Sequence, residues 1–206
     1  GNACLVVDEA HATGVVHGGR GAVYGMRPEF RDVVLCAIQT FGKAVGCHGA
    51  AVLGSKTLAS YIANYSHPFV YSTALPPAAI RLAARCYEHI AGSDGDARRD
   101  AVERVATELR ARLADIADDF PDVSLVPSAS PIHALVVPGP QRAVAAASAS
   151  KARGFDVGAI RAPTVPPGTE RLRITPGPLH TDQDINHLVS ALSDLWSQCA
   201  LSRAVA

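Results

Sequence analysis

A lysine lies within a stretch of small residues, Lys43 in TFGKAVGCHGA between positions 40 and 50. Apolar surroundings disfavour the charged form of an amine, and a neutral amine can form a Schiff base with an aldehyde. Small neighbours would let a flat ring lie close to the backbone, and the hydroxyl of Thr40 could bind a phosphate. The stretch has two interpretations, a surface lysine in a glycine-containing turn and a catalytic amine, and composition does not choose between them.

An acid and a histidine follow an apolar run near the start of the chain. The run is CLVV at 4–7, and Asp8 and His11 come after it. An aspartate here most often caps a turn, but a carboxylate can also pair with a pyridinium nitrogen and make the ring an electron sink. A histidine is more often a structural hydrogen-bonding group, but His11 could reach the edge of the same ring. A second apolar run, VVLCAI at 33–38, precedes Lys43. In parallel strands, Asp8, His11 and Lys43 would meet at the carboxyl ends, where ligands bind in α/β sheets.

The letters DEAH at positions 8–11 also occur in a class of helicases, where they bind magnesium and activate water. That interpretation requires a phosphate-binding loop, GxxxxGK[ST], upstream, and this sequence contains none. It also predicts basic nucleic-acid contacts, whereas 19 basic and 19 acidic side chains give a net charge of zero without a basic block. We therefore rank the helicase interpretation far below a site for a bound ring.

Composition indicates a globular protein of a reducing compartment. Of its 206 residues, 48% are hydrophobic and 18% charged, which is enough to bury a core. The five cysteines are scattered without a CxxC pair, so we expect free thiols and no metal site. No apolar run reaches the ~18 residues that span a bilayer, and we expect a cytoplasmic location. The chain opens at Gly1 and reaches a strand by Cys4, from which we expect further sequence upstream.

The first part of the chain is expected to belong to a larger mixed or parallel sheet. Short apolar runs predict strands, glycines predict a loop, and a proline pair predicts the first turn of a helix. The expected elements are strands at 4–7, 33–38 and 50–53, a loop at 14–25, a helix at 56–65, an extended segment and turn at 66–77, and a helix from the proline pair at 76–77 to about 91.

The sequence GSDG at 92–95 is expected to break the chain into two domains, 1–92 and 93–206. Apolar residues spaced by three and four predict an amphipathic helix at 96–118, whose charged residues we expect to be solvated: Arg98, Arg99, Glu103 and Arg110. The second domain is expected to be a small α/β sandwich of helices on one sheet. Its remaining expected elements are strands at 124–126, 132–137, 157–160 and 171–175, and helices at 141–153 and 182–198.

An arginine in the second domain follows an expected strand and precedes a proline-rich segment. Arg161 in IRAPTVPPGTERLRIT could form a fixed fork for a substrate carboxylate. An ion pair within the small domain is the alternative.

Four segments in this order resemble the α-oxoamine synthases, which are fold-type I pyridoxal phosphate (PLP) enzymes. They are DEAHATG at 8–14, TFGKAVG at 40–46, YSTALPP at 71–77 and RAPTVPPGTERLR at 161–173. The resemblance runs from about residue 1 to 198 and covers the C-terminal half of a typical member. It implies an α/β protein of the PLP-dependent transferase (aspartate aminotransferase-like) fold. The chain would contain the end of the large mixed-sheet domain and the small C-terminal domain.

The resemblance also implies roles for individual residues. Lys43 would form the Schiff base with PLP and later move the α-proton of the amino acid. Asp8 would pair with the pyridine nitrogen, and His11 with the 3-oxygen of the ring. Thr40 would contact the phosphate. Ser72 and Thr73 would contact the cofactor phosphate of a neighbouring subunit. Arg161, with Thr164, would bind the substrate carboxylate.

The implied reaction is a decarboxylating condensation of an amino acid with an acyl thioester in a homodimer with shared sites. The segments favour L-alanine and a pimeloyl thioester, either pimeloyl-CoA or pimeloyl-carrier protein, as used in biotin biosynthesis. Glycine with succinyl-CoA is the alternative, because GTERLRITPGPLHTD resembles that branch equally well. A truncated, inactive homologue that serves only in dimerisation is the remaining alternative.

Overall fold

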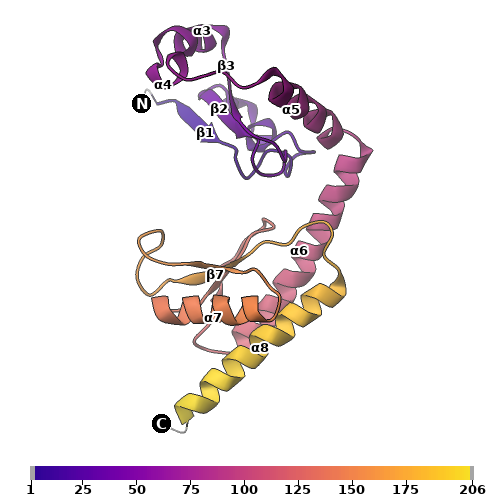
Figure 1. The fold of residues 1–206 in the computed structure, drawn as a ribbon, viewed down its shortest axis with the longest axis vertical. Coiled ribbons are helices and arrows are strands. Elements are labelled where there is room, and N and C mark those ends of the chain that lie inside the picture. Colours follow the sequence, from indigo (N-terminus) through magenta and orange to yellow (C-terminus); the bar gives the residue numbers. More distant parts are fainter. Residues whose placement is uncertain (1–2, 205–206) are drawn as a thin grey trace. The chain divides into compact units, whose positions relative to one another are not determined.

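The computed structural model describes residues 3–204, and the chain divides into two compact units, Gly1–Arg99 and Asp100–Ala206 (Figure 1). The division falls inside one long helix, close to the boundary expected between residues 92 and 93. That boundary stays a prediction for the domains of the whole protein. Each unit has its own sheet, and each is described here by itself.

The sheet of the first unit has three strands in the order β1-β2-β3. Strand β1 (Leu5–Asp8) pairs in parallel with β2 (Val34–Thr40), which pairs antiparallel with β3 (Ala50–Gly54). The β-branched and apolar runs of the sequence therefore form strands as expected, and the sheet is mixed. Strand β2 lies in the middle, so the loop that follows it is bounded by β1 on one side and β3 on the other.

The helices of the first unit are α1 (Ala22–Gly25), α2 (Pro28–Arg31), α3 (Lys56–Tyr65), α4 (His67–Val70) and α5 (Pro77–Ile90). Helices α3 and α5 follow the sequence signals, whereas α1 lies within the expected loop 14–25 and the short helices α2 and α4 were not predicted. Ser55 caps α3 by accepting a hydrogen bond from the Leu58 amide at 3.1 Å. The expectation of an extended segment throughout 66–77 is wrong, because Phe69 and Val70 both donate backbone hydrogen bonds to Ser66 and close a helical turn.

Helix α6 (Ser93–Asp119) begins earlier than the sequence predicts. Gly95 does not break the helix but lies inside it. A Cβ at this position would be 2.2 Å from the Ile90 carbonyl oxygen, so a side chain there would collide with the end of α5. The glycine therefore permits a close approach between the two helix ends, which is a different use from the break that we expected.

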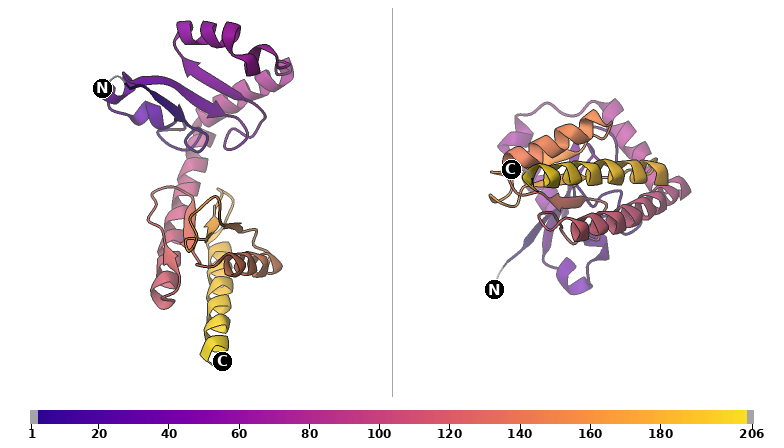
Figure 2. Two further views of the ribbon diagram at one scale, coloured as in Figure 1. Left: turned by 90° about the vertical axis from the view of Figure 1, so that its left-hand side faces the viewer. Right: turned by 90° about the horizontal axis from the view of Figure 1, so that it is seen from below.

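The second unit contains a four-stranded sheet in the order β4-β5-β7-β6, and every neighbouring pair is antiparallel. Its elements are β4 (Ser124–Leu125), β5 (His133–Val136), α7 (Pro140–Ala152), β6 (Gly158–Ile160), β7 (Arg171–Ile174) and α8 (Asp182–Ala204). The two views in Figure 2 show α7 and α8 side by side against the sheet.

The core of the second unit lies between one face of its sheet and the apolar stripes of its helices. Leu135 and Leu172 are fully buried and alternate with less buried neighbours along their strands, so one face of the sheet is covered. The predicted stripe of α6 supplies Leu109 and Leu113, and α8 supplies Leu192, all with exposed fractions of 2% or less. Burying each leucine contributes about 1.5–3 kcal/mol, so this core stabilises the unit on its own. No helix among residues 3–204 is long and apolar enough to cross a membrane.

Candidate active site at the ends of β1 and β2

The two loops that carry the predicted site residues leave the sheet side by side. Asp8 lies opposite Ile38 in the parallel pairing of β1 and β2, and the next amide, that of Glu9, donates to the Ile38 carbonyl at 2.8 Å. Strand β2 continues to Thr40, and Lys43 follows in the loop. The carboxyl ends of both strands therefore lie at one edge, which is where ligands bind in α/β sheets.

A glycine brings the two loops into direct contact. Gly14 has a φ of +79°, and a Cβ built on it would lie 2.9 Å from the Cβ of Ala44, the residue that follows Lys43. The same position is 3.5 Å from Cδ1 of Ile90 at the end of α5. The segments DEAHATG and TFGKAVG therefore pack against each other. Their positions after two neighbouring strands predict this contact.

The backbone around Lys43 is fixed, whereas its side chain is exposed. The Gly46 amide donates to the Lys43 carbonyl at 2.9 Å, and the Cys47 amide donates to the Phe41 carbonyl at 2.8 Å. The side chain of Val45 is buried, with an exposed fraction of 3%, and anchors the loop to the rest of the unit. The apolar residues that precede Lys43 lie in β2, and Lys43 itself is exposed in the turn that follows, so its role as a catalytic amine stays a prediction.

Asp8 has the turn-capping role that its position suggested, and its pairing with a ring nitrogen stays a prediction. One carboxylate oxygen, Oδ1, accepts a hydrogen bond from the Ala10 amide at 2.8 Å, which is the turn-capping role. Its other oxygen has no hydrogen-bond partner among residues 3–204, and the side chain is exposed. His11 is exposed in the turn that follows. The turn thus fixes Asp8 while leaving one acceptor oxygen free for a ligand.

Thr40 supplies a structural test of whether these residues fit a phosphate-bearing cofactor. Its hydroxyl oxygen is buried and has no hydrogen-bond partner in the described part of the chain. Leaving such a group unpaired costs about 1–3 kcal/mol, so native proteins rarely do so without a ligand or water. A phosphate oxygen at the end of β2 would satisfy this hydroxyl, and Thr40 therefore fits the contact that the sequence predicts.

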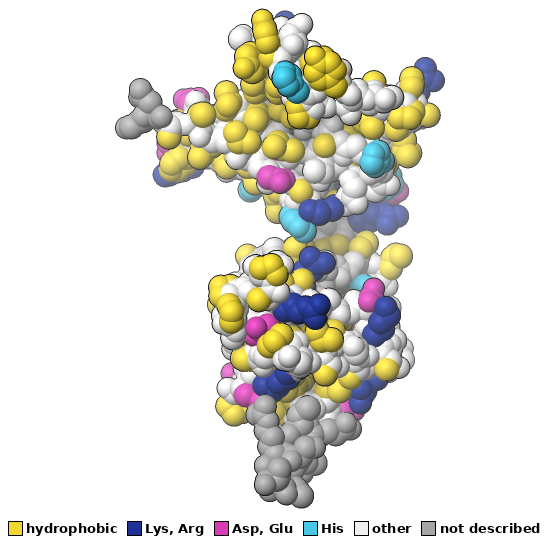
Figure 3. Space-filling model, turned by 60° about the vertical axis from the view of Figure 1, so that its left-hand side comes forward, with side chains coloured by type: hydrophobic (Ala, Val, Ile, Leu, Met, Phe, Trp, Pro, Cys, Tyr) yellow, Lys and Arg dark blue, Asp and Glu magenta, His cyan; other side chains and the backbone are white. Residues whose placement is uncertain are grey.

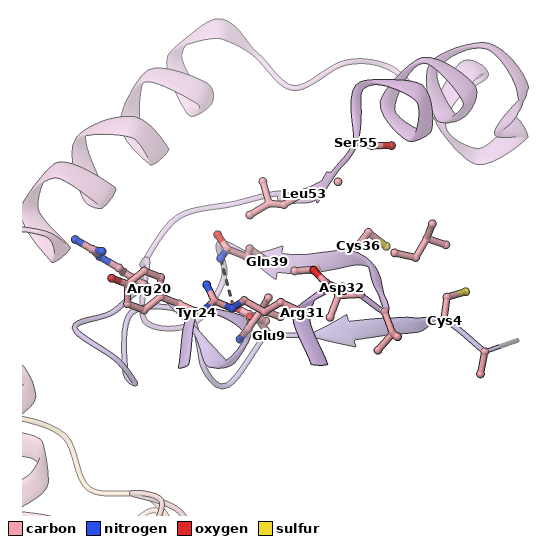
Figure 4. A pocket seen from close by; sticks show the side chains of 17 residues that line it. Cys4, Glu9, Arg20, Tyr24, Arg31, Asp32, Cys36, Gln39, Leu53 and Ser55 are labelled. Carbon is pink, nitrogen blue, oxygen red and sulfur yellow. Dashed lines mark hydrogen bonds between the residues drawn. The ribbon is translucent and has the colours of Figure 1, made fainter. Parts of the chain in front are cut away.

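A buried carboxylate, which the sequence does not single out, forms hydrogen bonds with two other elements at this edge of the sheet. Glu9 has an exposed fraction of 1% and accepts hydrogen bonds from the Val23 amide at 2.7 Å and from the Gln39 side chain at 3.3 Å. Gln39 in turn accepts from the Tyr87 hydroxyl of α5 at 2.7 Å. The network connects the end of β1, the middle strand and α5, and Figure 4 shows its Glu9–Gln39 bond beside a hollow of this unit.

The surroundings of this network explain two further observations. Gly21 has a φ of +95°, and a Cβ there would lie 1.7 Å from Oε2 of Glu9, so only glycine leaves room for the carboxylate. Burial raises the pKa of Tyr87, and the charges of Cys47 and Glu9 add to the shift. The sequence signal was available in part, since Gln39 directly follows the apolar run 33–38 and Glu9 is the second polar residue after the run 4–7.

The hollow in Figure 4 is not the predicted site. It is lined by Glu9 and Gln39 but not by Asp8, Thr40 or Lys43, and it includes the apolar side chains of Leu35 and Leu53. These two leucines are 45% and 48% exposed. The sheet of the first unit therefore has apolar surface without cover among the described residues.

Further apolar side chains are exposed around α3 and α4. Tyr61, Tyr65, Phe69 and Tyr71 have exposed fractions of 61%, 69%, 62% and 83%. Figure 3 shows many hydrophobic side chains on the visible face of this unit. Ser72 and Thr73 directly follow this aromatic patch and are exposed. Large exposed apolar patches mark interaction surfaces. Ser72 and Thr73, which were predicted to contact a second subunit, therefore lie beside a surface suited to such a contact.

Arg161 and Thr164 belong to the second unit, and their assignment to the Lys43 site stays a prediction. Arg161 directly follows β6 and is exposed, and its carbonyl accepts the Thr164 amide at 3.0 Å. The other end of this loop is held by Glu170, which sequence analysis did not single out. Its carboxylate, 2% exposed as a residue, accepts from the Gly139 amide at 2.9 Å and the Gly168 amide at 3.3 Å. These backbone hydrogen bonds lower the pKa of Glu170.

Two of the arginines on α6 are not solvated as expected. Arg99 donates to the Ile90 carbonyl at 2.9 Å and to Asp96 at 2.6 Å. Arg110 has buried Nε and Nη2 atoms without partners among the described residues, as has Nε2 of the neighbouring His133. Burial lowers the pKa of His133, and the charge of Arg110 lowers it further. No group of three or more potential metal ligands occurs in residues 3–204.

Comparison with known proteins agrees with the resemblance seen in the sequence. The model of the aminotransferase class I and II family matches residues 1–192. An 8-amino-7-oxononanoate synthase from Polaromonas naphthalenivorans is 37% identical over 204 residues, which are 97% of this chain and 49% of that protein. This chain therefore spans about half the length of that relative.

Solved structures with the same fold include an 8-amino-7-oxononanoate synthase and a serine palmitoyltransferase. The 8-amino-7-oxononanoate synthase of Francisella tularensis superimposes with a TM-score of 0.77 and 26% identity over 93% of this chain and 54% of that chain. The serine palmitoyltransferase of Sphingomonas wittichii superimposes with a TM-score of 0.84 over 97% of this chain and 49% of that chain. Its 23% identity supports the fold alone. By its family match and its fold, this chain belongs to the aminotransferase class I and II family, with the architecture of the fold-type I PLP-dependent transferases.

Proposed function

We propose that the protein containing this chain is a PLP-dependent acyltransferase of the α-oxoamine synthase type. Its substrates would be L-alanine and a pimeloyl thioester, and its product 8-amino-7-oxononanoate. The observation that carries the proposal is the contact between the Asp8 loop and the Lys43 loop at one edge of the sheet. The 37% identity to an 8-amino-7-oxononanoate synthase supports this choice of substrates.

Residues of the first unit would hold the cofactor. The Lys43 amine would bind its aldehyde, the free oxygen of Asp8 would accept a hydrogen bond from its protonated pyridine nitrogen, and the unpaired Thr40 hydroxyl would donate to its phosphate. His11 would bind the 3-oxygen. When bound, PLP spreads the negative charge that develops on the α-carbon of an amino acid.

Lys43 would also move a proton, and His11 would assist a later step. With PLP bound, the Lys43 amine would be placed to take the α-proton of the amino acid. The proposed overall reaction would join the α-carbon to the thioester carbonyl carbon, with loss of the thiol and of carbon dioxide. His11 would hydrogen-bond the keto acid during this loss. The fixed backbone of the Lys43 loop supports such a role, because proton transfer depends on close positioning.

Substrate recognition and assembly complete the proposal. Arg161, with Thr164 beside it, would bind the carboxylate of the substrate. Ser72 and Thr73 would reach the phosphate of a second subunit in a homodimer. The exposed aromatic patch at Tyr61–Tyr71 supports this arrangement, because it is large, apolar and adjacent to both hydroxyl residues. A cytoplasmic location and a place in biotin biosynthesis follow from the proposed reaction.

The experiment uses the full-length protein. Adding PLP should give a visible absorption band, and borohydride reduction should then fix the cofactor on Lys43, as identified by peptide mass spectrometry. A Lys43→Ala variant should lose both signals. Release of free thiol would be measured with alanine and pimeloyl-CoA or pimeloyl-carrier protein, and with glycine and succinyl-CoA. Label on another residue would refute the site. Turnover of glycine and succinyl-CoA alone would select the alternative branch, and a folded protein without label or turnover would identify an inactive homologue.

A further inference from the structure

The last residue of α5, Ile90, packs against two glycines of the turn at residues 14–19. A Cβ built on Gly14 would lie 3.5 Å from Cδ1 of Ile90, and a Cβ built on Gly19 would lie 2.6 Å from its Cγ2. The Gly14 amide donates to the Gly19 carbonyl at 2.9 Å, so both glycines belong to one closed turn. Gly14 is also the point at which this turn meets Ala44, the residue after Lys43. The position of Ile90 therefore affects how the turn rests on the Lys43 loop.

One arginine holds both Ile90 and the turn. Arg99, the last residue of the first unit, donates from Nη1 to the Ile90 carbonyl at 2.9 Å and from Nη2 to Asp96 at 2.6 Å. A Cβ built on Gly19 would lie 2.8 Å from the same Nη1, so the guanidinium also lies against the backbone of the turn. The side chain of Arg99 is only 15% exposed, whereas that of Asp96 is 67% exposed. Two charge-assisted hydrogen bonds from a planar group fix its geometry.

The turn is shaped to accept these side chains. Gly19 has a φ of +82°, and a side chain there would overlap both Ile90 and the guanidinium. Glycine therefore leaves a bare backbone surface on which both groups rest. Asp96 lies one turn before Arg99 on α6, where it can orient the guanidinium. A lysine could reach the Ile90 carbonyl, but it lacks the planar fork that meets two partners with two different nitrogens.

We propose that Arg99 is a positioning residue for the candidate site and holds the Asp8 loop against the Lys43 loop. Its guanidinium fixes Ile90 and the turn at 14–19, and that turn contacts the residue after Lys43. Arg99 would act through these loops and not on the ligand. The effect on the loops stands on these contacts, whereas the effect on PLP and turnover rests on the proposed function.

Removing the guanidinium should loosen the Lys43 loop. In Arg99→Ala the Ile90 carbonyl loses this donor, and the turn loses the group that lies against Gly19. A displacement of about 1 Å at a catalytic group costs about 100-fold in rate, so kcat should fall by up to about that factor. The ratio kcat/KM should fall equally, because the loop positions a group that acts in the transition state.

The first test measures the loops of the full-length protein without PLP or turnover. Amide hydrogen exchange in residues 9–19 and 41–49 should be faster in Arg99→Ala than in the wild type, and intermediate in Arg99→Lys. The matched control Arg98→Ala, at the exposed neighbouring arginine, should leave both segments unchanged. Unchanged exchange in strands β5 and β7 would show that each variant is folded, and Arg99→Lys carries the comparison if the alanine variant does not fold. Wild-type exchange at residues 41–49 in a folded Arg99 variant would overturn the proposal.

The second test separates positioning from a general loss of stability. A PLP titration followed at the absorption band should give a dissociation constant about 10- to 100-fold higher in Arg99→Ala, the range for losing one charge-assisted hydrogen bond. A merely structural role would lower the folded fraction but leave this constant and kcat per folded molecule as in the wild type. Faster exchange with both values unchanged would therefore refute the effect on the site. Absence of the PLP band in the wild type, with the exchange difference present, would refute the proposed function alone.

Discussion

Replacing Glu9 tests whether its buried hydrogen-bond network holds the two site loops. The carboxylate accepts the Val23 amide and the Gln39 side chain, and it is 1% exposed. Glu9→Ala leaves two buried donors unpaired, at about 1–3 kcal/mol each, so we expect a loss of about 2–6 kcal/mol of unfolding free energy. Glu9→Gln should cost only about 1–3 kcal/mol. Its amide can donate to Gln39, which can turn and donate to the Tyr87 hydroxyl, so that mainly the charge is lost.

Urea unfolding of the full-length protein measures both values, with Glu29→Gln as the matched control. Glu29 is an exposed glutamate in an ion pair with Arg27, and its replacement should change stability by less than about 0.5 kcal/mol. A Tyr87→Phe change in the Glu9→Gln background should cost a different amount from the same change alone, because both belong to one network. Equal costs for Glu9→Gln and Glu9→Ala, or costs no larger than that of Glu29→Gln, would refute this reasoning.

Further measurements test the other buried groups and the exposed lysine. Gly21→Ala should destabilise the protein by more than about 2 kcal/mol in urea unfolding, because its Cβ would overlap Oε2 of Glu9 and its φ is +95°. Above about pH 6.5 the lowered pKa of His133 does not reduce the free energy of unfolding, because His133 is neutral in both the folded and the unfolded chain. Stability should fall as the pH drops from there to the lowered folded-state pKa, since only the unfolded chain takes up the proton; His133→Asn should remove this slope in unfolding measured across pH. The lowered pKa of Glu170 contributes stability above about pH 4.5 that is lost as the pH falls through the folded-state pKa, and Glu170→Gln should flatten that acid limb. Lys43→Ala should leave the free energy of unfolding within about 0.5 kcal/mol of the wild-type value, because the side chain is exposed. The same change should abolish the PLP absorption band.

Periodicity predicted most of the elements because local pattern and burial agree in them. The stripe of α6 became the buried face that includes Leu109 and Leu113, and the run 33–38 became the middle strand. Prediction failed where a residue has a second use. The segment 92–95 was expected to separate two helices; α5 does end at Ile90, but α6 already begins at Ser93, so Gly95 lies inside it. Ser66 was expected in an extended segment and turn but accepts the bonds of a short helix.

The candidate site divides in the same way. Asp8, Thr40 and Lys43 could be proposed from sequence because their residue types suit one chemistry at the ends of neighbouring strands, and the structure places them at that edge of the sheet. Glu9 and Glu170 could not, because nothing local distinguishes a buried carboxylate from a solvated one. Their burial depends on amide groups delivered by distant residues, such as Val23 for Glu9 and Gly139 for Glu170. Sequence therefore shows the groups available for chemistry more readily than those that position them.

The pattern of satisfied and unsatisfied groups at the sheet edge separates positioning from ligand binding. Two groups that fix the loops are paired: the Glu9 carboxylate with two donors, and the Lys43 carbonyl with the Gly46 amide. Groups that face the edge are not. One oxygen of Asp8, the hydroxyl of Thr40 and the amine of Lys43 have no hydrogen bond or ion pair among the described residues. On the proposed function, this acceptor, donor and amine would bind the ring nitrogen, the phosphate and the aldehyde of PLP.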